Sequence, residues 1–290
     1  MPLNMIVLAK QVPDTANITC EAMKPDGTVN RGALPAIFNP EDLNALEMAL
    51  QIRDEHGGHI SVISMGPPAA ADLLRDALFR GADKVILLTH RLFAGADTLA
   101  TSYALARAVQ SLGLPDIVLC GRQAIDGDTA QVGPQIAEKL GIPQVTYVDR
   151  VVELGERTVL VSRSTDRGSC RIRAPLPVLL TVVSTANNPR PPSVRRMMVF
   201  KRARTKTELM SSTQDYEEAG PLEASGLLIE EWGVDTIGAD PNRCGMAGSP
   251  TKVKKVESVV ISPREVKRIE PTQSGIAALV EELISEHILG

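Results

Sequence analysis

The sequence predicts an α/β protein built on a doubly wound, mostly parallel sheet. Short apolar runs alternate with amphipathic segments of helical period over residues 3–140. Each apolar run ends in glycine, proline or a polar cluster, as strand-to-helix turns do. With 290 residues and 43% hydrophobic content, the chain can bury a large core. The repeated strand–helix order implies parallel strands, right-handed crossovers and helices on both faces of the sheet.

Composition excludes several classes of function. A net charge of −4 with mixed acids and bases, together with 3% aromatic residues, argues against a nucleic-acid-binding protein. The four cysteines form no C-x-x-C pair, so neither a zinc site nor a disulfide framework is indicated, and Cys120 is expected inside a strand. Since no basic segment followed by a long apolar run begins the sequence, we expect a cytoplasmic protein without membrane insertion.

The first strand and the first helix frame a polar turn. Residues 3–9 are strongly apolar, suit a central parallel strand and pass directly into the polar residues 10–15. Residues 20–35 are expected to form a hairpin or a long loop. A helix then opens at Asn39, with proline at its first position and two acids in its first turn. Asn39 either only caps this helix or also faces a ligand.

The same order repeats up to residue 120. We expect strands over residues 59–65, 84–88 and 117–120, a helix over residues 69–80, and another that begins at Asp97. Because ligands of open α/β sheets collect at the carboxyl ends of the strands, we expect the binding site at one rim. The residues at that rim are Ala9, Met65, Thr89 and Gly121.

The stretch from residue 117 to residue 137 is the one around which we expect the site to be organised. It reads as a strand, a polar turn at residues 126–129 that supplies cap chemistry, and a helix with an apolar stripe at Val132, Ile136 and Leu140. The free N–H groups of such a helix start suit a phosphate, and Gly127 and Gly133 would allow close approach. The stretch matches no Walker or dinucleotide fingerprint, so an ordinary capped turn is the alternative.

The later chain changes character. Short strand-like runs cover residues 145–148, 151–154, 158–161 and 178–183, with a hairpin near residue 155, and residues 187–192 break the pattern. Residues 190–206 carry seven basic side chains and no acid, which suits an acidic partner surface or an anionic ligand; a solvated linker is the alternative. We therefore divide the chain into an α/β domain (1–186), a basic linker (187–206) and a C-terminal part (207–290).

The C-terminal part is expected to contact another chain. Residues 214–249 are acidic, rich in glycine and proline and weakly periodic, so we expect an extended arm on which Trp232 anchors a second subunit. Residues 274–288 form one apolar helical face that must be buried on this chain or on a partner.

Several motifs, taken in order over nearly the whole chain, resemble the β subunit of electron-transfer flavoproteins. That family has an α/β sheet of the adenine-nucleotide-binding (ETF/hydrolase-like) type, which agrees with the element order above. The motifs are residues 10–15, 38–40, 64–67, 78–83, 121–134, 188–190 and 248–253.

The resemblance implies an adenine-nucleotide site. In the housekeeping branch this site holds a structural AMP, whereas in the electron-bifurcating branch it holds the AMP part of a second FAD. The loop at residues 126–134 and residues 247–252 are similar to the bifurcating branch. The residues implied to bind the cofactor are Ala9, Asn39, Pro40, Glu41, Asp42, Met65, Gly66, Asp126, Gly127, Asp128, Thr129, Ala130, Gln131, Val132, Gly133, Pro134, Gln135, Ile136 and Ala137.

The same resemblance implies a mechanism and partners. NADH would give hydride to the FAD, one electron would go to ferredoxin or flavodoxin, and the other would pass through the FAD of an α subunit to an acyl-CoA or related dehydrogenase. No catalytic acid or base and no metal ligand is assigned. Val194 stands where the housekeeping branch carries a leucine anchor. The residues implied to contact partners are Asn188, Pro189, Arg190, Val194 and Arg195, to which we add Trp232.

Two other functions stay open. The chain could be a housekeeping subunit that holds AMP and carries electrons between acyl-CoA dehydrogenases and other proteins. It could also be an adenine-nucleotide-binding sensor without redox function, because the fold alone does not decide function.

Overall fold

A computed structural model describes residues 2–14, 34–211, 219–252, 267–286 and 288–289. Its central element is a ten-stranded sheet in the order β11-β12-β5-β4-β1-β6-β10-β7-β8-β9. The strands are β1 (Leu3–Ala9), β4 (Gly58–Met65), β5 (Lys84–Leu88), β6 (Ile117–Gly121), β7 (Gln144–Leu154), β8 (Thr158–Thr165), β9 (Gly168–Pro175), β10 (Val178–Val182), β11 (Arg204–Thr205) and β12 (Leu228–Trp232). A separate antiparallel pair consists of β2 (Gln11–Pro13) and β3 (Ala36–Phe38). The loop or hairpin expected over residues 20–35 falls almost wholly outside the described residues.

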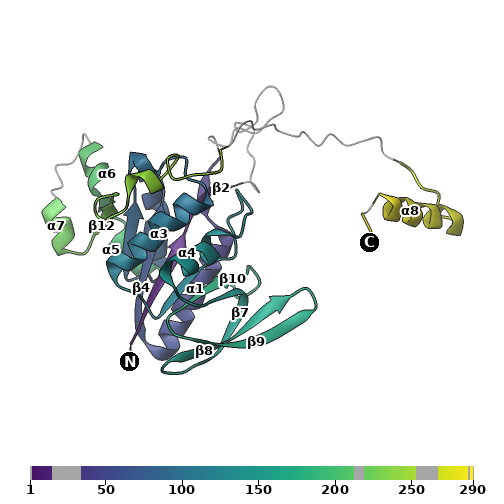
Figure 1. Cartoon of the computed structure of the whole chain (residues 1–290), viewed down its shortest axis with the longest axis horizontal. Coiled ribbons are helices and arrows are strands. Elements are labelled where there is room, and N and C mark those ends of the chain that lie inside the picture. Colours follow the sequence, from purple (N-terminus) through teal and green to yellow (C-terminus); the bar gives the residue numbers. More distant parts are fainter. Residues whose placement is uncertain (1, 15–33, 212–218, 253–266, 287, 290) are drawn as a thin grey trace.

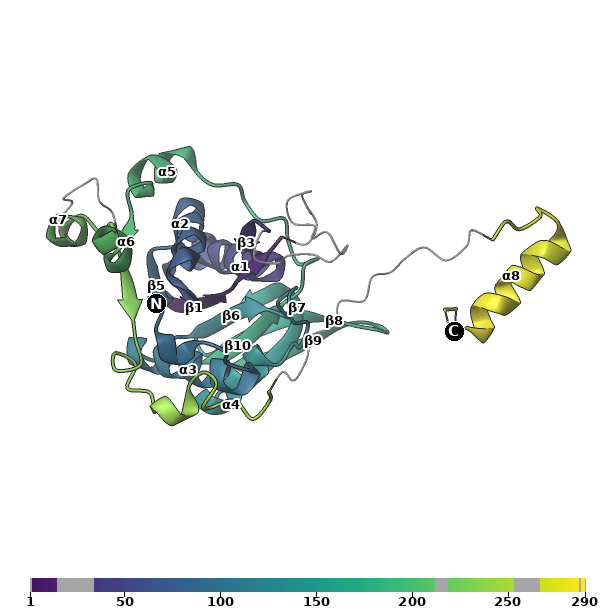
Figure 2. The same ribbon diagram turned by 90° about the horizontal axis from the view of Figure 1, so that it is seen from above.

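Helices cover both faces of the sheet, which confirms the doubly wound α/β fold (Figure 2). Strand pairing is parallel from β11 through β7, and only β7–β8 and β8–β9 are antiparallel. One core lies beneath α1 and α2, and the other lies beneath α3 and α4. The helices are α1 (Pro40–His56), α2 (Ala71–Arg80), α3 (Thr98–Leu112), α4 (Val132–Leu140), α5 (Val194–Phe200), α6 (Lys206–Ser211), α7 (Ala219–Ala224) and α8 (Gln273–Ser285).

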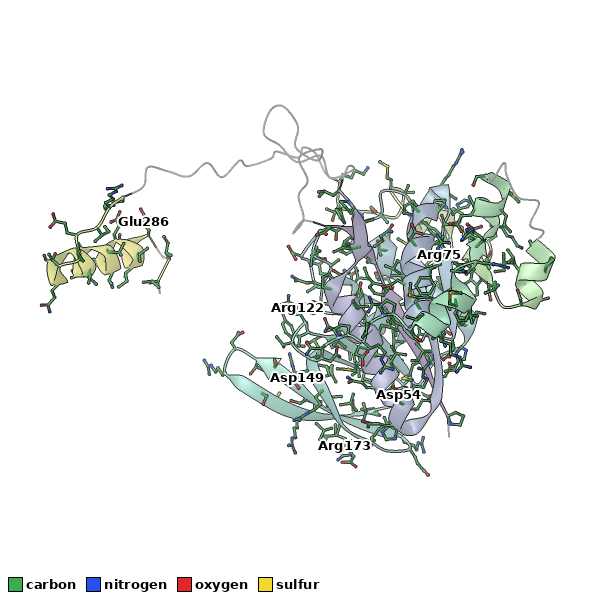
Figure 3. The ribbon with its side chains drawn as sticks, turned by 180° about the vertical axis from the view of Figure 1, so that it is seen from behind. Asp54, Arg75, Arg122, Asp149, Arg173 and Glu286 are labelled. Atoms are coloured by element: carbon green, nitrogen blue, oxygen red, sulfur yellow. The ribbon has the colours of Figure 1, made fainter. Side chains whose placement is uncertain are left out.

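Strands β7, β8 and β9 project from the helix-covered part of the sheet (Figure 1). The runs expected over residues 145–148 and 151–154 form the single long strand β7, the run over 158–161 is the start of β8, and the hairpin near residue 155 is confirmed. Strand β9 was not predicted, because alternating arginines and exposed small residues hide its pattern. Figure 3 shows Asp149 and Arg173 on this projecting part and Arg75 on the far side of the molecule.

The expectation of an extended arm over residues 214–249 is wrong for residues 219–249, and residues 214–218 lie outside the described residues. Strand β12 pairs in parallel with β5, so Trp232 lies in the main sheet, where its indole Nε1 donates to Glu230. Beyond β12, Val234, Ile237 and Cys244 are buried in the core beneath α3 and α4. Strand β12 was not predicted because it carries two glutamates. In the fold each glutamate has a partner, since Lys84 pairs with Glu230 and Thr207 donates to Glu231.

The amphipathic helix expected over residues 274–288 is present as α8. Figures 1 and 2 show it standing away from the sheet, beyond residues 253–266. Its apolar side chains at Ile276, Val280 and Ile284 are exposed. The apolar face of α8 is therefore left uncovered by the part of the chain that the structure describes.

Candidate functional site

A large cavity opens at the carboxyl ends of the central strands. β1 and β6 lie side by side, and the chain extends the sheet from β1 through β4 in one direction and from β6 through β10 in the other. This is a topological switch point, where open α/β sheets bind ligands. The cavity there measures about 1100 Å³, and its lining includes Ala9, Met65, Thr89 and Gly121. The predicted common rim of the strands is confirmed.

The structure divides the predicted cofactor residues into two groups. Asn39, Pro40, Glu41, Pro134, Gln135 and Ala137 do not line the cavity. Those that line it are Ala9, Asp42, Met65, Gly66, Asp126, Gly127, Asp128, Thr129, Ala130, Gln131, Val132, Gly133 and Ile136.

Asn39 is the N-cap residue of α1 as expected, but its side chain makes no cap hydrogen bond and instead holds the loop after β6. Its Nδ2 donates to the carbonyl of Gln123 at 2.9 Å, and its Oδ1 accepts from the N–H of Ile125 at 3.1 Å. The side chain is completely buried. An amide that both donates and accepts satisfies two loop groups at once, which a capping role would not require.

The two acids that follow Asn39 also contact the end of β6. Glu41 accepts from the N–H of Gln123 at 2.9 Å and pairs with Arg122 at 3.1 Å. Asp42 accepts from the N–H of Gly121 at 2.8 Å and from the N–H of Lys10 at 2.9 Å. Burial raises the pKa of Asp42 to about 7, although these hydrogen bonds act in the opposite direction. Hydrogen bonds to the first turn of α1 thus hold the end of β6 and the start of the following loop in place.

Ionisation of Asp42 is expected to make folding pH-dependent. Its pKa is about 7 in the folded chain against 3.8 when unperturbed, so the unfolded chain releases this proton first as the pH rises. Relative to Asp42→Asn, the free energy of unfolding of the wild type should fall by about 1.4 kcal/mol per pH unit between those two pKa values and then level off. Urea unfolding of both proteins from pH 5 to pH 8 measures this, and a difference that does not change with pH would contradict it.

The loop between β6 and α4 lines the cavity along residues 126–131, and its turn is closed by the N–H groups of Gly127 and Asp128, which donate to the carbonyl of Ala124. Asp128 and Ala130 have left-handed backbone angles, with φ of 49° and 52°. Alternation of such residues turns successive N–H groups toward one side and forms an anion-binding concavity. Helix α4 begins after Gln131, and no side chain caps it. Its positive end therefore remains available to a phosphate.

One prediction about this loop is wrong. Asp126 and Asp128 do not cap α4, because Asp126 pairs with Lys10 at 2.6 Å and Asp128 accepts from the side chain of Gln123 at 2.8 Å. Gly133 lines the cavity and is also closely packed, since a Cβ there would lie 2.9 Å from the Cys120 sulfur. The expectation that Cys120 lies buried in a strand is confirmed.

The opposite wall of the cavity is the segment from Thr89 to Thr98, ahead of α3. Asp97 caps α3 and also accepts from the N–H of Thr251 at 3.1 Å, while its own N–H donates to Ser249 at 2.8 Å. Burial raises the pKa of Asp97, but the hydrogen bonds from backbone N–H groups outweigh it and hold the pKa below its ordinary value. Ser249 and Thr251, which belong to the motif at residues 248–253, therefore hold this wall in place by hydrogen bonds to Asp97.

The polar residues of the lining that sequence reasoning did not single out include Lys10, Arg91, Arg122 and Thr207. The first three follow the ends of β1, β5 and β6, so their position just past an apolar run was a usable signal. Thr207 comes from α6 and could not have been found in this way.

The predicted partner residues lie in two settings. Arg190 is held by this chain, because it pairs with Glu47 at 2.8 Å and with Asp54 at 2.9 Å, and these bonds raise its pKa. Asn188 and Arg195 are exposed, Pro189 is half-buried, and Val194 is 74% exposed at the start of α5. Met197, Met198 and Val199 are also exposed, so α5 carries an apolar surface among basic side chains.

The described residues hold neither a metal-ligand cluster nor a membrane-spanning helix. No cluster of histidine, cysteine, aspartate or glutamate in those residues has the make-up of a metal site. None of the helices described is both long and apolar enough to cross a membrane.

Comparison with known proteins agrees with this geometry. A family model described as the electron transfer flavoprotein domain matches residues 26–207. The electron transfer flavoprotein subunit beta of Clostridium acetobutylicum is 42% identical, over 99% of this chain and 100% of that protein. Protein FixA of Sinorhizobium fredii is 41% identical over 98% of this chain and 93% of its own length. Subunit CarD of the caffeyl-CoA reductase-Etf complex of Acetobacterium woodii is 42% identical over 87% of this chain and 86% of its own length. The chain therefore belongs to the electron transfer flavoprotein family, among the proteins named subunit beta and FixA.

Proposed function

We propose that this chain is the β subunit of a heterodimeric electron transfer flavoprotein, that it binds FAD in the cavity at the β1/β6 switch point, and that it accepts hydride from NADH for electron bifurcation. The observation that carries the proposal is a cavity of about 1100 Å³ that extends from the uncapped end of α4 to the wall at Thr89–Thr98. Pockets for drug-sized ligands measure about 300–1,000 Å³. A cavity of this size favours a dinucleotide over AMP alone.

The residues present fit an FAD. The N–H groups of Gln131, Val132 and Gly133 would receive its pyrophosphate, with the left-handed residues Asp128 and Ala130 shaping the approach. When bound, FAD supplies the chemistry, because it takes up hydride and passes electrons on one at a time. The chain itself binds the cofactor, orients it and limits its contact with water.

This chain has exposed surfaces that suit contact with the proposed partners. The exposed apolar face of α8 suits burial on an α subunit. Trp232 is half-buried at the end of β12 and packs against the core of this chain, so only its remaining exposed part could contact a second subunit. Asn188, Pro189, Val194 and Arg195 lie in or next to the apolar and basic surface at α5, which suits an acyl-CoA or related dehydrogenase. The similarity to a subunit of a caffeyl-CoA reductase complex supports a partner of that class. Ferredoxin or flavodoxin would accept the other electron.

The test of this function is an anaerobic assay of the chain with its α subunit and partner dehydrogenase. We expect NADH to reduce ferredoxin or flavodoxin only while the dehydrogenase's own acceptor is present. A complex that transfers electrons to the dehydrogenase but never to ferredoxin or flavodoxin would contradict bifurcation and favour a carrier that holds AMP. A chain that binds adenine nucleotide and transfers no electrons would favour a sensor.

Arg91 is expected to bind the phosphates of NADH. Of the cations that line the cavity, Lys10 pairs with Asp126 and Arg122 pairs with Glu41, whereas the side chain of Arg91 makes no hydrogen bond or ion pair with any described residue. Loss of a charge-assisted hydrogen bond costs about 1.5–3 kcal/mol, so Arg91→Ala should raise the KM for NADH roughly tenfold or more.

The control for Arg91 is Arg150→Ala, which removes an exposed arginine on β7 that does not line the cavity. FAD content should be unchanged in both variants. An unchanged KM in Arg91→Ala would show that the NADH phosphates bind elsewhere.

A further inference from the structure

Two ion pairs lie next to the β1/β6 crevice, and the buried carboxylate of Asp42 belongs to neither. Arg122 pairs with Glu41 at 3.1 Å, and Lys10 pairs with Asp126 at 2.6 Å. Asp42 is 6% exposed and has no cation within ion-pair distance among the described residues. A buried acid without a counter-charge is costly to a fold and calls for an explanation.

The position of Asp42 supplies that explanation. β1 and β6 pair directly as far as Leu8 and Cys120, and beyond that point Asp42 accepts from Gly121 through Oδ1 and from Lys10 through Oδ2. One side chain thus bridges the two strand ends just past their last pair. Lys10 and Gly121 both line the cavity, and Gly121 leads into the loop that lines it along residues 126–131.

We propose that Asp42 is a positioning residue whose ionised carboxylate ties the ends of β1 and β6 together, and that its protonation weakens binding of the dinucleotide in the cavity. The inference rests on the proposed function. An ionised carboxylate accepts from both N–H groups, one on each oxygen. A protonated carboxyl turns one oxygen into an O–H donor that faces an N–H donor, so one end of the tie is weakened.

The surroundings set the pH at which this happens. Burial raises the pKa of Asp42 to about 7, and the charge of Glu41 on the same helix adds to the rise. The N–H groups of Gly121 and Lys10 and the side chain of Asn39 act against it. Of the other groups that face it, burial raises the pKa of the Cys120 thiol on β6, and Arg122 beyond β6 is bound to Glu41.

The test is the FAD affinity of the cavity between pH 6 and pH 8, in the complex of the full chain with an α subunit that keeps its own FAD. FAD is the probe because its pyrophosphate carries no group like the terminal phosphate of AMP, which titrates at a pKa of about 6. With the pKa near 7, the ionised fraction and hence the affinity should fall about tenfold from pH 8 to pH 6. In Asp42→Asn the affinity should be low and equal at both pH values.

The matched control is Asp116→Asn. Asp116 also accepts a backbone N–H, from Asn4 at 2.7 Å, but at the amino end of β1 and away from the cavity. This variant should keep the pH dependence of the wild type. If Asp42→Asn does not fold, the amide NMR signal of Gly121 in the wild type reports the tie, and it should shift between pH 6 and pH 8.

Three other results would each overturn a proposal. FAD affinity that does not depend on pH in the wild type, or a Gly121 amide signal that does not move, would overturn the role of Asp42 while leaving the FAD site intact. Absence of a second FAD at every pH would overturn the proposed function and this inference with it.

Discussion

Replacing Gly121 by alanine is expected to abolish cofactor binding in the cavity and to destabilise the fold. A Cβ at this position would lie 2.6 Å from Oδ1 of Asp42 and 2.7 Å from the backbone of Glu41 and Asp42. Because two of these contacts are backbone atoms, the first turn of α1 must move away from β6. Overpacking of this kind costs about 1–3 kcal/mol, and the hydrogen bond from Gly121 to Asp42 is lost as well.

The expected measurements for Gly121→Ala are cofactor content and thermal unfolding. A displacement of about 1 Å at a binding loop can cost about 100-fold, so the purified variant should lack the cofactor of the cavity. Gly155→Ala, in the turn between β7 and β8, is the matched control, since a Cβ there meets its nearest atoms at 3.5 Å. Full cofactor content in Gly121→Ala would show that contact between α1 and β6 does not shape the site.

Replacing Asn39 by aspartate separates a loop-holding role from a capping role. Aspartate and asparagine are equally good N-caps, so a cap alone would tolerate the change. The structure predicts a loss of stability. An ionised aspartate cannot donate to the carbonyl of Gln123, and it places a charge where Asn39 is fully buried. The cost should be about 1–3 kcal/mol or more, together with weaker FAD binding.

Denaturant unfolding and FAD titration measure the effect at Asn39. Asp240→Asn makes the reverse exchange at a true cap, where Asp240 accepts from the N–H of Asn242, and it should change stability by less than about 0.5 kcal/mol. Equal, small effects at both positions would mean that Asn39 is only a cap.

The fold was largely readable from the sequence because its central strands are buried on both faces. Strands such as β1 and β6 are continuous apolar runs, and the helices between them show an apolar stripe. β12 was not readable, because Glu230 and Glu231 make sense only beside Lys84 and Thr207, which are distant in sequence. The place of β10 between β6 and β7 also depends on non-local pairing.

The site was readable in outline and not in its details. The carboxyl-end rim followed from strand order, and the loop after β6 followed from its turn residues and the stripe of α4. Side-chain roles in the first turn of α1 did not follow, since Asn39, Glu41 and Asp42 match a standard helix start. Their hydrogen bonds reach residues about 80 positions away. Local sequence patterns contain no information about such contacts.

The central claim is that the cavity at the β1/β6 switch point holds FAD, and one measurement tests it most directly. The chain is co-purified with its α subunit, and the FAD and AMP released per heterodimer are counted. We expect two FAD and no AMP per heterodimer. One FAD and one AMP would contradict it and identify a housekeeping carrier, and a heterodimer without flavin would contradict a redox function altogether.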